Sequence, residues 1–161
     1  MTRRARSTMR GMHIRPATDD DLDALVALGH RFFAFSRFAD FVKFDASAAR
    51  ASLSRLKESG LVLVAEAADG QIAGGIAGLL APVWFNPSAC MAAELGWWVD
   101  EAYRGSSAGV KLAKAFEQWA REHGAVAVSM SDLVISGATP AGQLFEKLGY
   151  RVVERCQVKA V

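Results

Sequence analysis

Residues 94–112 read Glu94-Leu-Gly-Trp-Trp-Val-Asp-Glu-Ala-Tyr-Arg-Gly-Ser-Ser-Ala-Gly-Val-Lys-Leu112, and this stretch decides the fold prediction. The part that ends at Val99 has the composition of a β-strand, and a short turn follows it. A loop of small residues then runs from Arg104 to Gly109, of which five of six are Gly, Ala or Ser. A long amphipathic segment comes next, so the stretch predicts a strand, a small-residue loop and a helix.

The loop has the properties of an anion site. Small residues let backbone N–H groups approach a ligand closely, and the first N–H groups of a helix have no partners within it. The helix dipole adds partial positive charge at the same end, and Arg104 adds a charged donor. The segment therefore predicts a site for a diphosphate. The structural alternative stays open at this point, because small residues also serve tight turns that bind nothing.

Strands and helices are predicted on both sides of this segment from hydrophobic spacing and turn residues. The strands are expected at residues 12–15, 61–67, 72–83, 90–99, 125–130 and 150–158. The helices are expected after Thr18, from Asp45 or Ser47 to about Ser59, from Ser106 or Ser107 to about His123, and from Pro140 to Gly149. The order β-α-α-β-β-β-α-β-α-β indicates one α+β domain with a mixed sheet.

Length and charge limit the classes of protein that the chain can belong to. The chain has 161 residues, is 52% hydrophobic and contains no run of eighteen apolar residues, so we expect one domain and no membrane span. The net charge is +2, and subtracting the four arginines of the first eleven residues leaves −2 for the remainder. We expect residues 1–11 to form a disordered basic leader and residues 12–161 to form the domain.

Partners and location follow from the same counts. Arginines in the leader could contact nucleic acid, but the slightly acidic domain argues against a large phosphate footprint, so no nucleic-acid partner is expected. Cys90 and Cys156 are interpreted as buried thiols of a cytoplasmic protein, with a disulfide between them as the alternative. The two cysteines have no metal-site spacing, and no metal is expected.

Three segments, in the correct order, resemble the GNAT family of N-acetyltransferases. Residues 99–109 resemble the cofactor motif of that family, which is Arg or Gln, two residues, Gly, one residue, then Gly or Ala. Residues 141–151, Ala-Gly-Gln-Leu-Phe-Glu-Lys-Leu-Gly-Tyr-Arg, resemble the family ending "A..LYEKLGF". The opening Ile14-Arg-Pro-Ala-Thr18, followed by Asp and Leu, is the third similarity. Together they extend over most of residues 12–155.

The resemblance implies a fold and an activity. The fold is the α+β GNAT fold, with a mixed central sheet of about six to seven strands flanked by about four helices. The implied activity is transfer of an acetyl group from acetyl-coenzyme A (acetyl-CoA) to a primary amine, on a small molecule or a peptide. Homodimers are common in the family, so a homodimer is one alternative, and the oligomeric state stays open. The implied cofactor-binding residues are Trp97, Trp98, Val99, Arg104, Gly105, Ser106, Ser107, Ala108 and Gly109.

The chain departs from the family pattern at two positions. Ser107 stands where the family usually has its central glycine, and serine is small enough to preserve coenzyme A binding. Phe145 stands where many members have the tyrosine that reprotonates the leaving thiolate. Because phenylalanine has no hydroxyl, that role is vacant or moves to another group, for which Tyr103, Tyr150, Ser136, Thr139 and water are the candidates. The alternative function is therefore an acyl-CoA-binding module of the same fold with weak or no catalysis.

The general base and the acceptor site are predicted less specifically. A carboxylate can take a proton from the amine if its pKa suits the task. Glu94 is the first candidate because it lies on the strand that leads to the cofactor, and Asp132 is the second. The alternative for Glu94 is an exposed strand residue without a catalytic role, and the alternative for Asp132 is a loop or helix-cap residue. Phe35, Phe38 and Phe41 are candidates for an acceptor pocket, and their alternative is ordinary packing or a dimer contact.

Overall fold

The computed structural model describes residues 11–133 and 139–161 and contains one mixed β-sheet. Its five strands lie in the order β1-β2-β3-β4-β5. The first four pair antiparallel, and β5 pairs parallel to β4. The strands are β1 (His13–Pro16), β2 (Leu61–Glu66), β3 (Ile72–Val83), β4 (Asn86–Val99) and β5 (Ala127–Ser129). This confirms the α+β fold with a mixed sheet.

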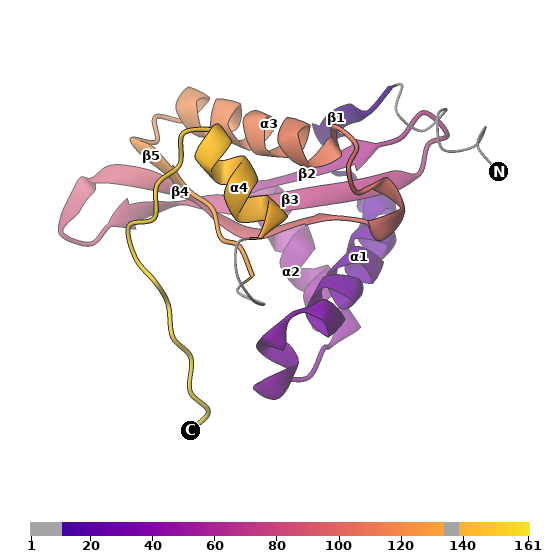
Figure 1. Cartoon of the computed structure of the whole chain (residues 1–161), viewed down its shortest axis with the longest axis horizontal. Helices are drawn as coiled ribbons and strands as arrows, with labels where there is room; N and C mark the ends of the chain where they lie inside the picture. Colours follow the sequence, from indigo (N-terminus) through magenta and orange to yellow (C-terminus); the bar gives the residue numbers. More distant parts are fainter. Residues whose placement is uncertain (1–10, 134–138) are drawn as a thin grey trace.

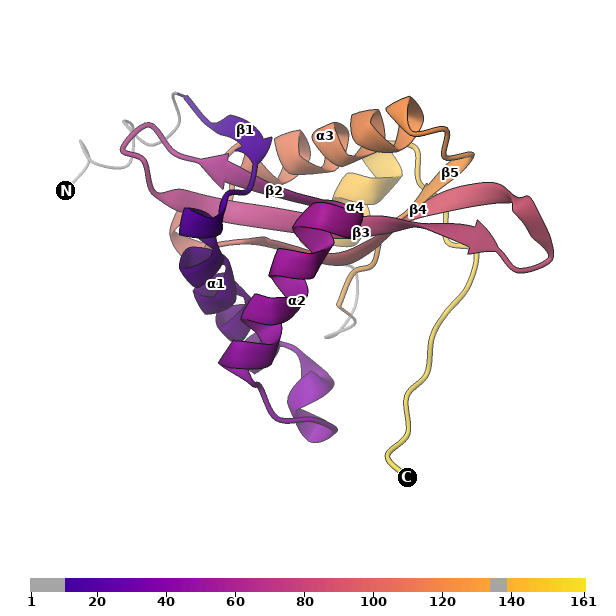
Figure 2. The ribbon, with the colours of Figure 1, turned by 180° about the vertical axis from the view of Figure 1, so that it is seen from behind.

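The helices cover the two faces of the sheet in pairs (Figures 1 and 2). One face carries α3 and α4, and the other carries α1 and α2. The α-helices are α1 (Leu22–Phe35), α2 (Ala46–Ser59), α3 (Ala108–Glu122) and α4 (Pro140–Lys147). Short 3-10 turns occupy Asp19–Asp21, Arg37–Asp40 and Glu101–Tyr103. The sheet therefore separates two hydrophobic layers.

Each layer has its own core. On the α3 side, Ile76 of β3 packs with Leu112 and Phe116 of α3, and all three are almost completely buried. On the α1 side, Leu25 and Leu28 pack against Val62 and Val64 of β2. The apolar side of the amphipathic segment predicted after Gly109 is thus the inner face of α3, which places the N-terminus of that helix beside the end of β4.

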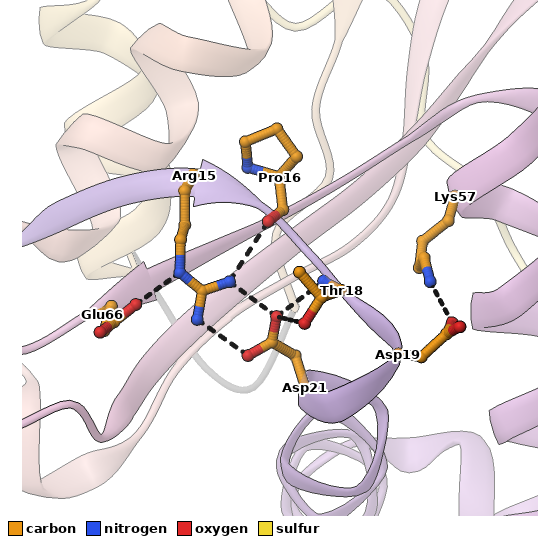
Figure 3. A network of polar contacts seen from close by, with 7 residues as sticks. All are labelled: Arg15, Pro16, Thr18, Asp19, Asp21, Lys57 and Glu66. Atoms are coloured by element: carbon orange, nitrogen blue, oxygen red, sulfur yellow. Dashed lines mark hydrogen bonds and ion pairs between the residues drawn. The ribbon is translucent and has the colours of Figure 1, made fainter.

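A partly buried ion-pair network joins β1 and β2 to the turn before α1 (Figure 3). The Arg15 guanidinium donates to both carboxylate oxygens of Asp21, at 2.7 and 2.9 Å, and also pairs with Glu66. Asp21 further accepts hydrogen bonds from the backbone N–H and the hydroxyl of Thr18. These donors, with the Arg15 hydrogen bond as the largest effect, lower the pKa of the Asp21 carboxyl to about 2, although its burial acts in the opposite direction.

Replacing Asp21 with Asn is expected to lower the free energy of unfolding by about 2 kcal/mol at pH 7, since each pKa unit is worth about 1.4 kcal/mol. Because the folded-state pKa lies below the unfolded value, the stabilisation is complete above about pH 4 and is lost as the pH falls towards 2. Urea unfolding between pH 2 and pH 7 measures both effects. Asp20→Asn, in the same turn but exposed, is the matched control, and an equal loss there would contradict the assignment.

The β3–β4 hairpin extends beyond the rest of the sheet and carries two exposed aromatic residues at its tip (Figure 1). Trp84 and Phe85 are 86% and 74% exposed and pack edge to face against each other. The prediction started the β4 strand at residue 90, but the strand begins at Asn86, because the hairpin continues with a tight turn.

The predicted last strand at residues 150–158 is wrong. Residues 151–161 contain no strand, are exposed throughout, and leave the sheet as an extended tail (Figure 1). Strand-forming residues such as Val152 and Val153 therefore have no neighbouring backbone to pair with, and a strand needs such a partner. The described sheet accordingly has five strands and not the expected six or seven.

Other expectations have mixed outcomes. Cys90 and Cys156 are both free, but Cys90 is only half-buried and Cys156 is exposed, which corrects the expectation that both are buried. The leader predicted at residues 1–11 lies, except for Gly11, outside the described residues, as does Ser136. Within the part of the chain that the structure describes, no helix is long and apolar enough to span a bilayer.

Candidate functional site

The β4 strand carries a bulge at the point where it stops pairing with β5. Gly78 of β3 lies opposite Glu94, and the next residue, Ala77, lies opposite Gly96, so Leu95 is an extra residue. Pairing with β5 is confined to Met91–Ala93. In the described chain, the outer edge of β4 from Glu94 to Val99 therefore has no strand beside it, and its backbone groups are available to a ligand.

Glu94 is held at this point by the chain that follows β5. Its carboxylate accepts a hydrogen bond of 3.1 Å from the backbone N–H of Ser131. Burial raises the pKa of the Glu94 carboxyl from 4.5 to about 7, and the Ser131 hydrogen bond only partly opposes this shift. A carboxylate with a pKa near neutrality can accept a proton from an amine and release it to solvent.

The small-residue loop has the geometry expected of an anion site. Gly105 has a φ of 82°, which favours glycine, and Ser106 accepts a hydrogen bond from the N–H of Ala108. Helix α3 then begins, and the N–H groups of Ser107, Gly109 and Val110 have no acceptor in residues 11–133 and 139–161. These donors and the helix dipole can together bind a phosphate group.

Gly109 brings this loop close to β4. A Cβ atom there would lie 3.1 Å from the Trp97 ring and 3.6 Å from a methyl group of Val99. The absence of a side chain thus lets the first turn of α3 lie directly against the end of β4. Loop and unpaired strand edge form one continuous surface, which is what a ligand with a diphosphate and an extended amide-containing arm requires.

Trp97 and Trp98 lie on opposite faces of the sheet. The Trp97 ring packs 5.2 Å from Phe145 of α4, and the Trp98 ring packs 5.4 Å from Phe32 of α1. Both indole N–H groups are buried and have no acceptor among the described residues. Buried donors without partners are uncommon in folded proteins, and a ligand or an ordered water commonly satisfies them.

The Arg104 side chain points to the α1 side of the site. Its guanidinium lies 4.5 Å from the centre of the Trp98 ring and 5.5 Å from that of Phe35. Nearby, Arg31 of α1 pairs with Asp100 at 2.6 Å. The Arg104 backbone thus belongs to the predicted cofactor loop. Its guanidinium lies over Trp98 and Phe35, on the face of the sheet away from α3.

Asp132 is placed at the N-terminus of α4. It accepts a 2.6 Å hydrogen bond from the hydroxyl of Thr139, which in turn caps the helix by accepting from the N–H of Gly142. This is the cap environment that the sequence offered as the alternative to catalysis. Among the two carboxylates, Glu94 is the one with a clear pKa shift towards neutrality.

No tyrosine hydroxyl is placed beside Glu94. Phe145 is buried between Trp97 and Tyr150. The Tyr150 hydroxyl donates to Glu117 of α3 at 2.9 Å, and burial with this contact raises its pKa. The Tyr103 hydroxyl contacts Gln71 at 3.4 Å. The identity of the group that protonates the thiolate stays a prediction.

An apolar cavity of about 230 Å³ lies between the sheet and the α1 and α2 helices. Phe32, Leu53, Leu95, Gly96 and Trp98 are among its lining residues. The phenylalanines predicted for the acceptor pocket lie outside this lining: Phe35, Phe38 and Phe41 are 50%, 50% and 41% exposed. Of these, Phe35 is tied to the site through Trp98, at 5.5 Å between ring centres.

Sequence reasoning missed several residues of this region. Gly29 and Phe32 of α1 line the cavity, but helical spacing alone makes them ordinary core positions. Leu95 and Gly96 also line it, because the bulge changes the course of β4. A bulge adds one residue to a strand without altering its composition, so no pattern in the sequence indicated it.

Comparison with known proteins agrees with this geometry. Residues 29–150 match the model of the acetyltransferase (GNAT) family, which extends over most of the chain. A search of curated proteins found no match.

Solved structures with low sequence identity share the fold. An acetyltransferase from Trypanosoma brucei is 19% identical, with a TM-score of 0.72 and coverage of 94% of this chain and 100% of that one. Glucosamine-6-phosphate N-acetyltransferase from Arabidopsis thaliana is 15% identical, with a TM-score of 0.73 and coverage of 93% and 98%. A predicted acetyltransferase from Clostridium acetobutylicum, solved with acetyl-CoA, is 15% identical, with a TM-score of 0.71 and coverage of 92% and 96%.

The family match includes the bulged strand, the small-residue loop and α4, which are the elements that form the site. The similarity of fold extends over nearly the whole chain in each of the three structures. The chain therefore belongs to the GNAT family of acetyltransferases.

Proposed function

We propose that the protein transfers an acetyl group from acetyl-CoA to a primary amine, with Glu94 as the general base. The observation that carries this proposal is the position of Glu94. It is half-buried at the bulge, its pKa is raised to about 7, and it lies on the strand that leads to the anion-binding loop. Family membership supports acetyl transfer, and the chemistry of these residues supports an amine as the acceptor.

The unpaired backbone groups of the site fit coenzyme A in two respects. The free N–H groups at the start of α3 suit a diphosphate, and the unpaired edge of β4 suits the amides of a pantetheine arm. When bound, acetyl-CoA supplies an activated acetyl group whose C–S bond breaks as the amine nitrogen forms a bond to the carbonyl carbon. The loop residues from Arg104 to Gly109 would hold the diphosphate, and residues 97–99 would hold the arm.

The role of Glu94 is to remove one proton from the amine. A protonated amine has no lone pair for attack, and a carboxylate of pKa about 7 accepts its proton directly or through one water. The backbone N–H of Ser131 holds the carboxylate in place at 3.1 Å. Because the thiolate that leaves must also gain a proton, water is the simplest donor for a site whose tyrosines make other contacts.

Calorimetry and an assay for free thiol test the proposal together. The expected result is acetyl-CoA binding in the micromolar range and release of thiol that depends on an added amine. Mass spectrometry should then find an acetyl group on the amine. Absence of acetyl-CoA binding would contradict the whole proposal.

The alternative function, an acyl-CoA-binding module, rests on Phe145. This residue is buried and has no group that can donate a proton. Tight acetyl-CoA binding without any amine-dependent thiol release would favour the module over the enzyme.

A further inference from the structure

We propose that the acceptor amine carries a single compact apolar group, aryl or branched aliphatic, which occupies the cavity between the sheet and the α1 and α2 helices. This inference rests on the proposed function and specifies its acceptor. The chemistry of the cavity lining, the cavity's size, its position relative to Glu94 and the charges near it all favour such an acceptor.

The lining is almost entirely apolar. Among the described residues, no Asp, Glu, Lys or Arg side chain lines the cavity, and the lining residues from α1 and α2 are aliphatic, aromatic or glycine. Phe32 and Trp98 meet edge to face at 5.4 Å and form an aromatic wall. An apolar group gains free energy when it moves from water into such a site, and a charged group loses it.

The size of the cavity limits the occupant. An apolar cavity of about 150 Å³ can hold a benzene molecule. The volume of about 230 Å³ found here therefore fits one aromatic ring with a short alkyl link. An aminoglycoside with several sugar rings is larger than this space, and each of its hydroxyl groups would need a partner that the lining lacks.

The position of the cavity connects it to the chemistry. Leu95 and Gly96 belong to the lining and directly follow Glu94 in the bulge. An apolar group seated against these residues would leave a short amine-bearing chain to reach the carboxylate at the strand edge. This arrangement separates recognition of the apolar body from activation of the nitrogen.

The surrounding charges do not favour a polycation or a phosphorylated sugar. A polyamine needs carboxylates along its length, and the lining supplies none. Of the nearby cations, Arg31 is paired with Asp100, and Arg104 lies over Trp98 and Phe35. A phosphate placed in the cavity would find no cationic side chain in the described lining, whose side-chain donors are the indole N–H groups of Trp97 and Trp98.

Gly29 offers a substitution that fills the cavity without a clash. It lies within α1 and lines the cavity, and a Cβ atom built there has no neighbour within 4 Å. Any other residue that favours helices should also stabilise this helix relative to glycine, by about 1 kcal/mol. Gly29→Leu is therefore expected to fold normally and to reduce the space for the acceptor.

The experiment compares 2-phenylethylamine, spermidine and glucosamine 6-phosphate as acceptors. We expect kcat/KM for 2-phenylethylamine to exceed the other two values by at least about tenfold. Gly29→Leu should raise the KM for 2-phenylethylamine by at least about tenfold, since loss of space for even one methylene costs this much. Gly29→Ala should give an intermediate KM. Ala27→Leu adds the same side chain on the exposed face of α1 and should leave the kinetics unchanged.

Binding of the amine without turnover separates this inference from the proposed function. With coenzyme A, which has no acetyl group to transfer, 2-phenylethylamine should bind the unmodified protein, and Gly29→Leu should weaken that binding by a similar factor. Binding that Gly29→Leu leaves unchanged would overturn the inference, as would higher kcat/KM for spermidine or the sugar phosphate. A protein that binds 2-phenylethylamine in this way but acetylates no amine would contradict only the proposed function.

Discussion

Replacing Glu94 with Gln is expected to lower kcat by about 10²- to 10⁴-fold, the usual contribution of a positioned general base. Glutamine has nearly the same shape, and its amide oxygen can still accept the hydrogen bond from Ser131. The substitution therefore removes the base with little change in packing. Affinity for acetyl-CoA, measured by calorimetry, should remain within about threefold of the original value.

The pH profile gives a second readout of the same residue. If the ionised Glu94 is the active form, kcat/KM should rise tenfold per pH unit below about pH 7. Above that pH Glu94 is ionised, and its titration should no longer change kcat/KM. In Glu94→Gln the inflection near pH 7 should disappear. A variant that keeps the inflection with normal activity would show that another group is the base.

Asp132→Asn is the matched comparison, because it removes the other candidate carboxylate. Its contact with Thr139 indicates a role at the start of α4, so we expect a small loss of stability and activity within a fewfold of normal. If Asp132→Asn instead abolished turnover and Glu94→Gln did not, the assignment of the base would be reversed.

Glu94 should also make stability depend on pH. Its folded-state pKa is raised, so its favourable contribution is present below the unfolded value of 4.5 and is lost as the pH rises to about 7. A shift of this size corresponds to about 3 kcal/mol. Glu94→Gln should therefore unfold at a higher denaturant concentration than the original protein at pH 8, which would reveal a stability cost of keeping the base buried.

Ser107→Glu is expected to weaken acetyl-CoA binding by at least about 100-fold, the second large effect. The new carboxylate would lie at the N-cap of α3, where it repels the diphosphate and competes for the free N–H groups of Gly109 and Val110. Loss of two charge-assisted hydrogen bonds, at about 1.5–3 kcal/mol each, accounts for this factor. Calorimetry with acetyl-CoA measures the change directly.

The same substitution should not destabilise the protein. A negative charge at a helix N-terminus contributes about 0.3–1 kcal/mol in favour of the helix, so the melting temperature should stay constant or rise. Ser47→Glu places the same charge in the first turn of α2, away from the loop, and should leave acetyl-CoA binding intact. Ser107→Ala tests the hydroxyl alone. Undiminished binding by Ser107→Glu would exclude the start of α3 as the diphosphate site.

Much of the fold could be predicted from the sequence because its signals are local. The cap at Asp45 and the amphipathic pattern of α3 each specify nearby backbone geometry. The loop from Arg104 to Gly109 was identifiable for the same reason, since its small residues and the following helix are adjacent in the chain. Glu94 was identified as a candidate general base from its place on the strand before that loop.

The parts that failed depend on contacts between distant segments. Residues 150–158 have the composition of a strand, but a strand forms only where another edge is free and near, and the tail leaves the sheet. That Phe35, Phe38 and Phe41 contact the acceptor stays a prediction, and it is Phe32 of α1 that lines the cavity. Which helical face meets the sheet there depends on the packing of α1 against α2 and β4.

The bulge in β4 shows how little sequence change separates an open strand edge from a continuous sheet. Glu94 and Gly96 both keep their partners in β3, and Leu95 between them has none. In evolutionary terms, the gain or loss of this one codon would leave both hydrophobic layers in register, because the flanking side chains keep their faces. Inherited insertions are usually tolerated in loops. In this protein the extra residue lies inside a strand. It distinguishes a sheet that only supports the fold from a sheet with an unpaired strand edge that can bind a ligand.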